Sequence, residues 1–230
     1  MPSRRLLEKL KKQPRVPLSK KYLGELVSSG REGVFFDERR RVLKFGAELR
    51  TPINFRPQNY FEAAGVDLER AWRLAVADAW RHACLYRYLV KREIYPPGTR
   101  AFVYTSVKDG ETCPAIGLAI PKLRPLKSHS INITHVFANE TPPQVLMKIA
   151  AINKHPELAK IASPSSDIYQ IQNWGRKRRS NKYYFFDTHF VSFEDETGEG
   201  RLTLPHDWKT SNGEVPTLFE AEKKLFERKK

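Results

Sequence analysis

The sequence predicts an α+β fold in which antiparallel β-hairpins pack on one long amphipathic helix. Three observations lead to this class: apolar residues recur at helical spacing over residues 67–93, short apolar segments alternate with turn residues, and the N-terminal residues are basic and rich in proline. The chain has 230 residues and is 40% hydrophobic, which suffices for one good-sized domain or two small ones. We therefore expect a basic N-terminal arm over residues 1–32, a globular domain over 33–205, and a C-terminal linker and helix over 206–230.

The long helix is expected from about Asp67 to Glu93. Asp67 suits the N-cap position because its carboxylate can accept hydrogen bonds from free amides of the first turn, and Pro96-Pro97-Gly98 ends the helix. One buried stripe is predicted to contain Leu68, Trp72, Ala75, Ala79, Ala83, Tyr86 and Leu89 or Val90. Most arginines of this segment, Arg81 among them, fall off the stripe, so we expect them to form a solvated face.

Hairpins are predicted on both sides of this helix. Residues 33–46 place two apolar strands around a charged turn, and strands over 99–106 and 115–120 flank the turn signal Asp109-Gly110. A further strand is expected over 131–137. The aromatic strand over 183–193 should pair with residues 201–204.

Shorter elements fill the remaining chain. Thr141 is expected to cap a helix that has Pro142 at its first position, a short helix follows over 156–161, and a strand is expected over 168–171. Residues 47–61 should be irregular, and residues 216–230 should form an amphipathic helix. In the arm, residues 28–30 (Ser-Ser-Gly) are predicted to form a flexible joint.

Charge is the strongest functional signal. The net charge is +15 at pH 7, and a compact protein with this self-repulsion is stabilised by a polyanionic partner such as nucleic acid. Residues 1–60 carry 15 Lys and Arg against 6 Asp and Glu, whereas residues 191–230 carry 7 against 9. The two ends should therefore meet different neighbours, and the C-terminal helix is expected to contact protein.

The cluster from Arg176 to Lys182 is the best functional candidate. Five of its seven residues are cationic, and four aromatic residues follow over 183–186. A flexible cationic loop suits a phosphate backbone, and the flanking rings can stack on unpaired bases. For the rings we favour ordinary strand packing, with Tyr184 and Phe186 facing the core and their neighbours covered.

Further cations could act with this cluster. The predicted RNA-binding residues are Arg4, Arg5, Lys9, Lys11, Lys12, Arg15, Lys20 and Lys21 in the arm, Arg39, Arg40 and Arg41 at a hairpin tip, Lys122, Arg124 and Lys127 in a basic loop, and Arg176, Lys177, Arg178, Arg179 and Lys182. Exposed turns also collect charge without any function, and at the hairpin tip this simpler interpretation is equally good.

Signals for catalysis are poor. The 6 histidines are scattered, and the 2 cysteines, Cys84 and Cys113, have no zinc-ligand spacing and form no disulfide framework. Asp187 and His189 share a strand face, but no nucleophile accompanies them. We therefore expect no enzymatic activity, cofactor, metal or small-molecule substrate.

Three hypotheses remain. The first is a structural RNA-binding protein of a large ribonucleoprotein, specifically a lineage-specific mitochondrial ribosomal protein that contacts ribosomal RNA and neighbouring ribosomal proteins. The second is a non-catalytic accessory subunit of a mitochondrial respiratory or ATP-synthase complex, whose cations would meet acidic protein or anionic lipid. The third is a nucleic-acid-modifying enzyme with dispersed residues such as Asp187, His189 and Glu140.

The expected location is the mitochondrial matrix, and a cytoplasmic or nuclear ribonucleoprotein is the alternative. Residues 1–14 are basic with apolar residues interspersed, which suits either an import signal or an RNA-binding tail, although Glu8 counts against an import signal. No apolar run reaches the length of a membrane span.

Overall fold

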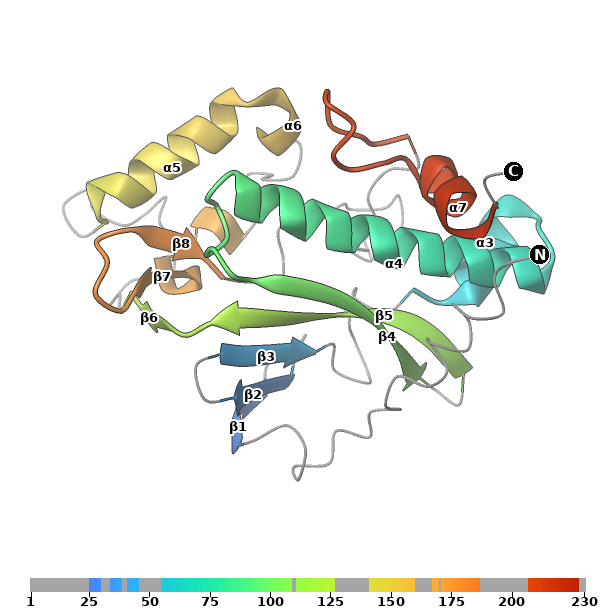
Figure 1. Cartoon of the computed structure of the whole chain (residues 1–230), viewed down its shortest axis with the longest axis horizontal. Coiled ribbons are helices and arrows are strands. Elements are labelled where there is room, and N and C mark those ends of the chain that lie inside the picture. Colours follow the sequence, from blue (N-terminus) through green and yellow to red (C-terminus); the bar gives the residue numbers. More distant parts are fainter. Residues whose placement is uncertain are drawn as a thin grey trace. The chain divides into compact units, whose positions relative to one another are not determined.

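The computed structural model describes residues 25–29, 34–38, 41–45, 55–108, 111–126, 141–159, 167–169, 171–186 and 207–227. These residues form a mixture of helices and antiparallel sheets, as an α+β fold requires (Figure 1). The chain divides into two compact units. Unit 1 comprises Met1–Tyr88, Arg100–Ala119 and Leu204–Lys230, and unit 2 comprises Leu89–Thr99 and Ile120–Thr203.

Unit 1 contains a five-stranded sheet in the order β1-β2-β3-β5-β4. Its strands are β1 (Glu25–Ser29), β2 (Val34–Glu38), β3 (Arg41–Phe45), β4 (Arg100–Lys108) and β5 (Glu111–Pro121), the last of which ends in unit 2. The predicted hairpins are confirmed: β2 pairs antiparallel with β3, and β4 pairs antiparallel with β5 from Arg100↔Ala119 to Lys108↔Glu111. Residues 113–120 of β5 are all buried, as befits an interior strand.

Strand β1 contradicts the prediction of a flexible joint at residues 28–30. Ser28 and Ser29 belong to β1, which pairs antiparallel with β2 starting at Glu25↔Asp37. Ser-Ser-Gly is typical of a loop, but the neighbouring strand supplies hydrogen-bond partners that override this local preference. Residues 1–24 lie outside the described residues.

Helix α4 (Leu68–Lys91) is the longest helix of the described chain. The Asp67 carboxylate accepts a 2.7 Å hydrogen bond from the Arg70 amide, as its N-cap role predicts. Residues 74–79, 81–86 and 88–89 are buried, so burial extends well beyond one stripe, while Leu68, expected on that stripe, is 63% exposed. In Figure 1 the helix runs along β4 and β5.

Helix α3 (Pro57–Ala64) occupies a segment that was predicted to be irregular. Pro57 stands at its first position, where the missing amide costs nothing and the fixed φ already suits a helix. Gly65 ends it with φ 60 and donates its amide to the Phe61 carbonyl. Pro57 is therefore a helix start signal, although the proline favoured the prediction of an irregular segment.

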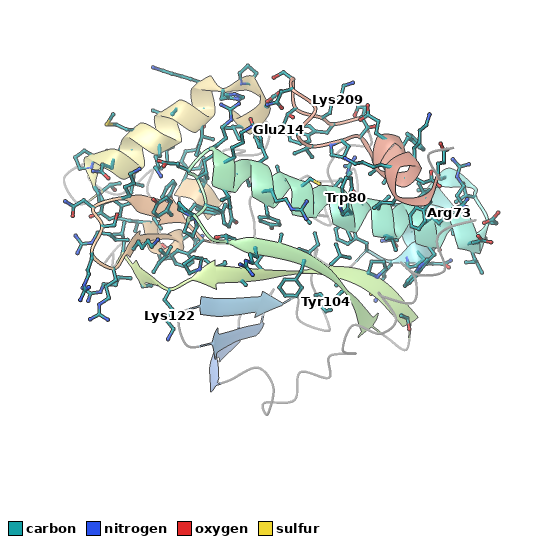
Figure 2. The ribbon with its side chains drawn as sticks, viewed as in Figure 1. Arg73, Trp80, Tyr104, Lys122, Lys209 and Glu214 are labelled. Atoms are coloured by element: carbon teal, nitrogen blue, oxygen red, sulfur yellow. The ribbon has the colours of Figure 1, made fainter. Side chains whose placement is uncertain are left out.

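Helix α7 (Leu218–Phe226) packs on the first half of α4 within unit 1. Thr217 and Glu220 form a reciprocal capping box at its start. Phe226 packs against Val76, and Lys224 lies 5.3 Å from the centre of the Trp80 ring. Figure 2 labels Trp80 on α4.

Unit 2 holds a three-stranded sheet in the order β6-β7-β8. Its elements are β6 (Leu123–Pro125), α5 (Pro143–Lys154), α6 (Pro156–Ala159), the 3₁₀ turns η1 (Asp167–Tyr169) and η2 (Ile171–Asn173), β7 (Trp174–Lys177) and β8 (Tyr183–Phe185). The core contains Trp174 and Phe185, whose ring centres lie 5.7 Å apart, and Tyr95 at 5.8 Å from Phe185. The Trp174 indole donates a 2.7 Å hydrogen bond to the Ile168 carbonyl.

Four expectations for unit 2 are corrected. Thr141 does not cap α5: its hydroxyl is buried without a hydrogen-bond partner, and Pro142 is the N-cap residue. Ile168 and Tyr169 belong to the 3₁₀ turn η1, and Ile171 begins the 3₁₀ turn η2, where a strand was predicted. Two segments expected to be loops contain strands, namely β6 and β7. The strands expected over 131–137, 187–193 and 201–204 lie outside the described residues.

Candidate nucleic-acid interface

The pairing of β6 with β7 brings together two basic segments that are far apart in the sequence. The register is Leu123↔Lys177, Arg124↔Arg176 and Pro125↔Gly175. Gly175 permits this close approach, because a Cβ there would lie 2.9 Å from the Leu123 Cβ and 3.1 Å from the Arg124 carbonyl oxygen.

Arg124 and Arg176 stand directly opposite each other on neighbouring strands. Arg176 is also paired with Tyr183 of β8, so the three residues form a row across the sheet. Arg124 is exposed, whereas Arg176 and Tyr183 are half-buried. Like charges that face each other across two strands destabilise a sheet unless an anion lies nearby.

The turn after β7 adds two more cations. The Ser180 amide donates a 3.1 Å hydrogen bond to the Lys177 carbonyl, which places Arg178 and Arg179 at the two central positions of the turn. Both side chains are exposed. Arg179 has φ 62, a left-handed backbone conformation that glycine adopts more readily than arginine.

We call Arg124, Arg176, Lys177, Arg178 and Arg179 the basic sheet edge. Within the described part of the chain, none of these five side chains forms an ion pair with a carboxylate. Lys122 is exposed next to β6 and is labelled in Figure 2.

Lys182, also a predicted RNA-binding residue, has an acidic partner. Its ammonium group lies 3.1 and 3.2 Å from the two carboxylate oxygens of Glu93. This hydrogen bond and the negative charge of Glu93 raise the pKa of Lys182. The positive charge of Lys182 is therefore partly neutralised within the protein.

Lys148 of α5 supports the base of the β7–β8 hairpin. Its ammonium group donates hydrogen bonds to the Glu93 carbonyl and, at 2.7 Å, to the Tyr183 carbonyl, and it lies 4.4 Å from the centre of the Tyr184 ring. Burial is the main cause that lowers the pKa of Lys148 to about 8. Because Lys148 and Lys182 both bind Glu93, the hairpin is anchored to the turn that follows α4.

The remaining predicted RNA-binding residues are not brought to this surface by the described structure. Arg41 opens β3 in unit 1, opposite Glu38 in the register, and its side chain is not described. Residues outside the description are Arg4, Arg5, Lys9, Lys11, Lys12, Arg15, Lys20, Lys21, Arg39, Arg40 and Lys127. Asp187, His189 and Glu140, proposed for the enzyme hypothesis, also lie outside it.

Unit 1 contains a buried polar cluster that the sequence reasoning missed. The Asp78 carboxylate accepts hydrogen bonds from the Tyr60 hydroxyl at 2.5 Å and from the Arg81 Nε at 2.7 Å. The His82 Nδ1 lies 2.9 Å from the Asp78 carbonyl, which can only accept, so this nitrogen carries a proton. Arg81 is 0% exposed, so the expectation that it belongs to a solvated face is wrong.

Spacing was the signal that could have revealed this cluster. Arg81 and His82 follow Asp78 by three and four residues, which places all three on one side of a helix. Cys84 and Cys113 are buried as free thiols, and burial raises the pKa of Cys84. Among the described residues, no group of three or more His, Cys, Asp or Glu side chains could hold a metal ion.

No protein-family model matches the sequence, and no curated protein or solved structure is significantly similar to it. No helix in the described ranges combines the length and the apolar character needed to cross a membrane. The geometry and charge of the chain itself therefore provide the evidence for its function.

Proposed function

We propose that the protein is a structural RNA-binding component of a large ribonucleoprotein particle and that it contacts RNA through the basic sheet edge. The observation that carries this proposal is the register that places Arg124 opposite Arg176 with no carboxylate bound to either side chain within the described chain. Phosphate groups between such arginines would replace repulsion with attraction, and the release of counterions would favour binding.

The turn arginines extend the same surface. Arg178 and Arg179 are exposed at the hairpin tip, and a guanidinium group can bind one phosphate through two parallel hydrogen bonds. Phosphate contacts of this kind fix the position of a protein on RNA without reading its sequence. This suits a structural component of a particle.

The particle that we propose is a mitochondrial ribosome. The high net charge and the basic character of residues 1–14 support this assignment. The competing hypothesis, an accessory subunit of a membrane complex, would require the same cations to meet acidic protein or anionic lipid.

The first test is a salt titration of RNA binding with the purified full-length protein. The double variant Arg124→Gln/Arg176→Gln should bind RNA about 10-fold more weakly near physiological salt, and the slope of log affinity against log salt should become shallower by about 0.7–0.9 per lost phosphate contact. Because the variant removes like charges that face each other, its thermal stability should be equal to or higher than that of the wild type. Reduced binding will then reflect the surface and not the fold.

Lys182→Gln is the matched control for this experiment. It removes one positive charge from the same hairpin, but that charge is already paired with Glu93, so we expect a smaller change of slope. Unchanged binding by the double variant would contradict the proposed surface.

A second test locates the particle. The tagged protein is sedimented from lysate on a density gradient with and without RNase. Migration with a ribosomal subunit that is lost on RNase treatment supports the proposal, whereas migration with a membrane complex that is indifferent to RNase overturns it in favour of the accessory-subunit hypothesis.

A further inference from the structure

Tyr183 is more exposed than the aromatic residues Trp174, Tyr184 and Phe185. Trp174 and Phe185 are 0% exposed and Tyr184 is 3% exposed, so these rings belong to the core of unit 2. Tyr183 is half-buried, and within the described chain its side chain makes no hydrogen bond and no contact with another ring. The described core of unit 2 therefore leaves part of this ring uncovered.

The position of Tyr183 connects it with the basic sheet edge. It is the β8 member of the row formed with Arg124 and Arg176. Neighbouring strands lie about 4.8 Å apart, so a pair of cations and an aromatic ring follow one another across roughly 10 Å of sheet surface. This distance is comparable with the distance from a phosphate group of RNA to the base of the same nucleotide or of the adjacent nucleotide.

The backbone that carries this ring is held in place. The Tyr183 carbonyl accepts the hydrogen bond from Lys148, and the next two residues of β8 are buried. The Tyr183 amide and carbonyl therefore belong to a packed strand, so little conformational freedom is lost when the ring meets a ligand.

We propose that the basic sheet edge binds an unpaired RNA segment, with Arg124 and Arg176 on its phosphates and Tyr183 stacked on one of its bases. This inference rests on the proposed function and specifies its ligand. In an RNA duplex both faces of an interior base are already stacked, so a half-exposed aromatic ring gains a partner only from bases that are unpaired.

The test compares two RNA probes that contain the same strand. One is a single-stranded RNA of roughly 12 nucleotides, within the range that such surfaces cover, and the other is this strand annealed to its complement. The wild-type protein should bind the single strand at least about 10-fold more tightly. Tyr183→Leu should weaken single-strand binding by about 5- to 150-fold, because stacking on an aromatic ring contributes about 1–3 kcal/mol per base, and should leave duplex binding within about 2-fold.

Two variants separate stacking from other effects. Tyr183→Phe keeps the ring and should retain wild-type affinity. Tyr169→Leu removes another half-buried tyrosine of unit 2, which instead donates a hydrogen bond to Asn153, and it should bind RNA normally. The salt slope of Tyr183→Leu should equal that of the wild type, because the substitution removes no phosphate contact.

An RNA that lacks bases but keeps its phosphates provides a readout without any mutation. Wild-type protein should bind this probe with the affinity that Tyr183→Leu shows for the intact strand. Equal binding of single strand and duplex, together with unchanged binding by Tyr183→Leu, would overturn the inference, while a loss of affinity in Arg124→Gln/Arg176→Gln would still support the proposed function. If the protein bound none of the RNA probes, both this inference and the proposed function would be overturned.

Discussion

At the scale of single residues, the feature with the largest energetic consequence is the carboxylate of Asp78. Burial alone would raise its pKa, but the positive charge of Arg81 and the hydrogen bonds from His82 and Tyr60 outweigh burial and lower the pKa to about 2. Burial is also the main cause that raises the pKa of the Tyr60 hydroxyl, with the neighbouring Asp78 adding to it. The cluster therefore contains a charged pair, Asp78 and Arg81, next to the neutral hydroxyl of Tyr60.

This low pKa predicts how stability depends on pH. An unfolded aspartate titrates near pH 4, so the native state gains stability from Asp78 that is fully present above about pH 4 and is lost as the pH falls towards 2. The gain amounts to about 2–3 kcal/mol for a shift of this size.

Asp78→Asn should lower the free energy of unfolding at pH 7 by about 3–5 kcal/mol, because Arg81 remains buried without its partner. The variant should also flatten the pH dependence of the free energy of unfolding between pH 4 and 2. Denaturant unfolding at several pH values measures both effects.

Glu69→Gln is the control for this prediction. The Glu69 carboxylate is 71% exposed and lies 3.9 Å from Arg73, so its loss should change the free energy of unfolding by less than about 0.5 kcal/mol. Equal effects of the two variants would show that the buried cluster is not a significant source of stability.

At the scale of secondary-structure elements, the sequence predicted those whose signals are local. The β2–β3 and β4–β5 hairpins follow from alternating residues around turns, and Asp67 marks the start of α4 because capping involves only the first turn. The strands β6 and β7 are short and charged, and they form by pairing with each other although about fifty residues separate them in the sequence. No window of sequence contains that information, so the candidate site was predicted as separate loops, and the alignment of Arg124 with Arg176 was not foreseen.

The turn between β7 and β8 offers a prediction at this scale. Arg179 adopts φ 62, whereas Arg178 has a negative φ. Arg179→Gly should raise the free energy of unfolding by about 0.5–1 kcal/mol because the left-handed strain is relieved. Arg178→Gly removes the same charge but adds only freedom to the unfolded chain, so it should lower the free energy by about 0.4–1 kcal/mol.

Thermal or denaturant unfolding of the two glycine variants gives the comparison directly. Both variants lose one cation of the basic sheet edge, so both should bind RNA more weakly in spite of their opposite stabilities. If binding followed stability, with Arg179→Gly binding more tightly than the wild type, the turn arginines would act through folding and not through phosphate contacts.

At the scale of the whole molecule, charge is distributed unequally between the two units. The described residues of unit 2 include 11 Lys and Arg but only 3 Asp and Glu, whereas those of unit 1 include 12 against 13. The described part of unit 1 is therefore nearly neutral, and its cations meet acids, as Arg70 and Arg73 meet Glu222. The excess positive charge of the described structure belongs to unit 2, which also carries the basic sheet edge.

Because the excess positive charge belongs to unit 2, we predict that added salt and RNA stabilise unit 2 more than unit 1. At an ionic strength of about 0.01 M the screening length is about 30 Å, and near 0.15 M it is about 8 Å, so added salt should relieve repulsion within unit 2. Exchange of the Phe185 amide, which donates to the Ile94 carbonyl, should slow several-fold on adding either salt or RNA. The Phe55 amide of unit 1, which donates to the Pro114 carbonyl, should change less than about 2-fold. Hydrogen exchange resolved by residue measures both amides in one sample, and equal protection of the two would show that the polyanion acts on the whole chain and not on unit 2.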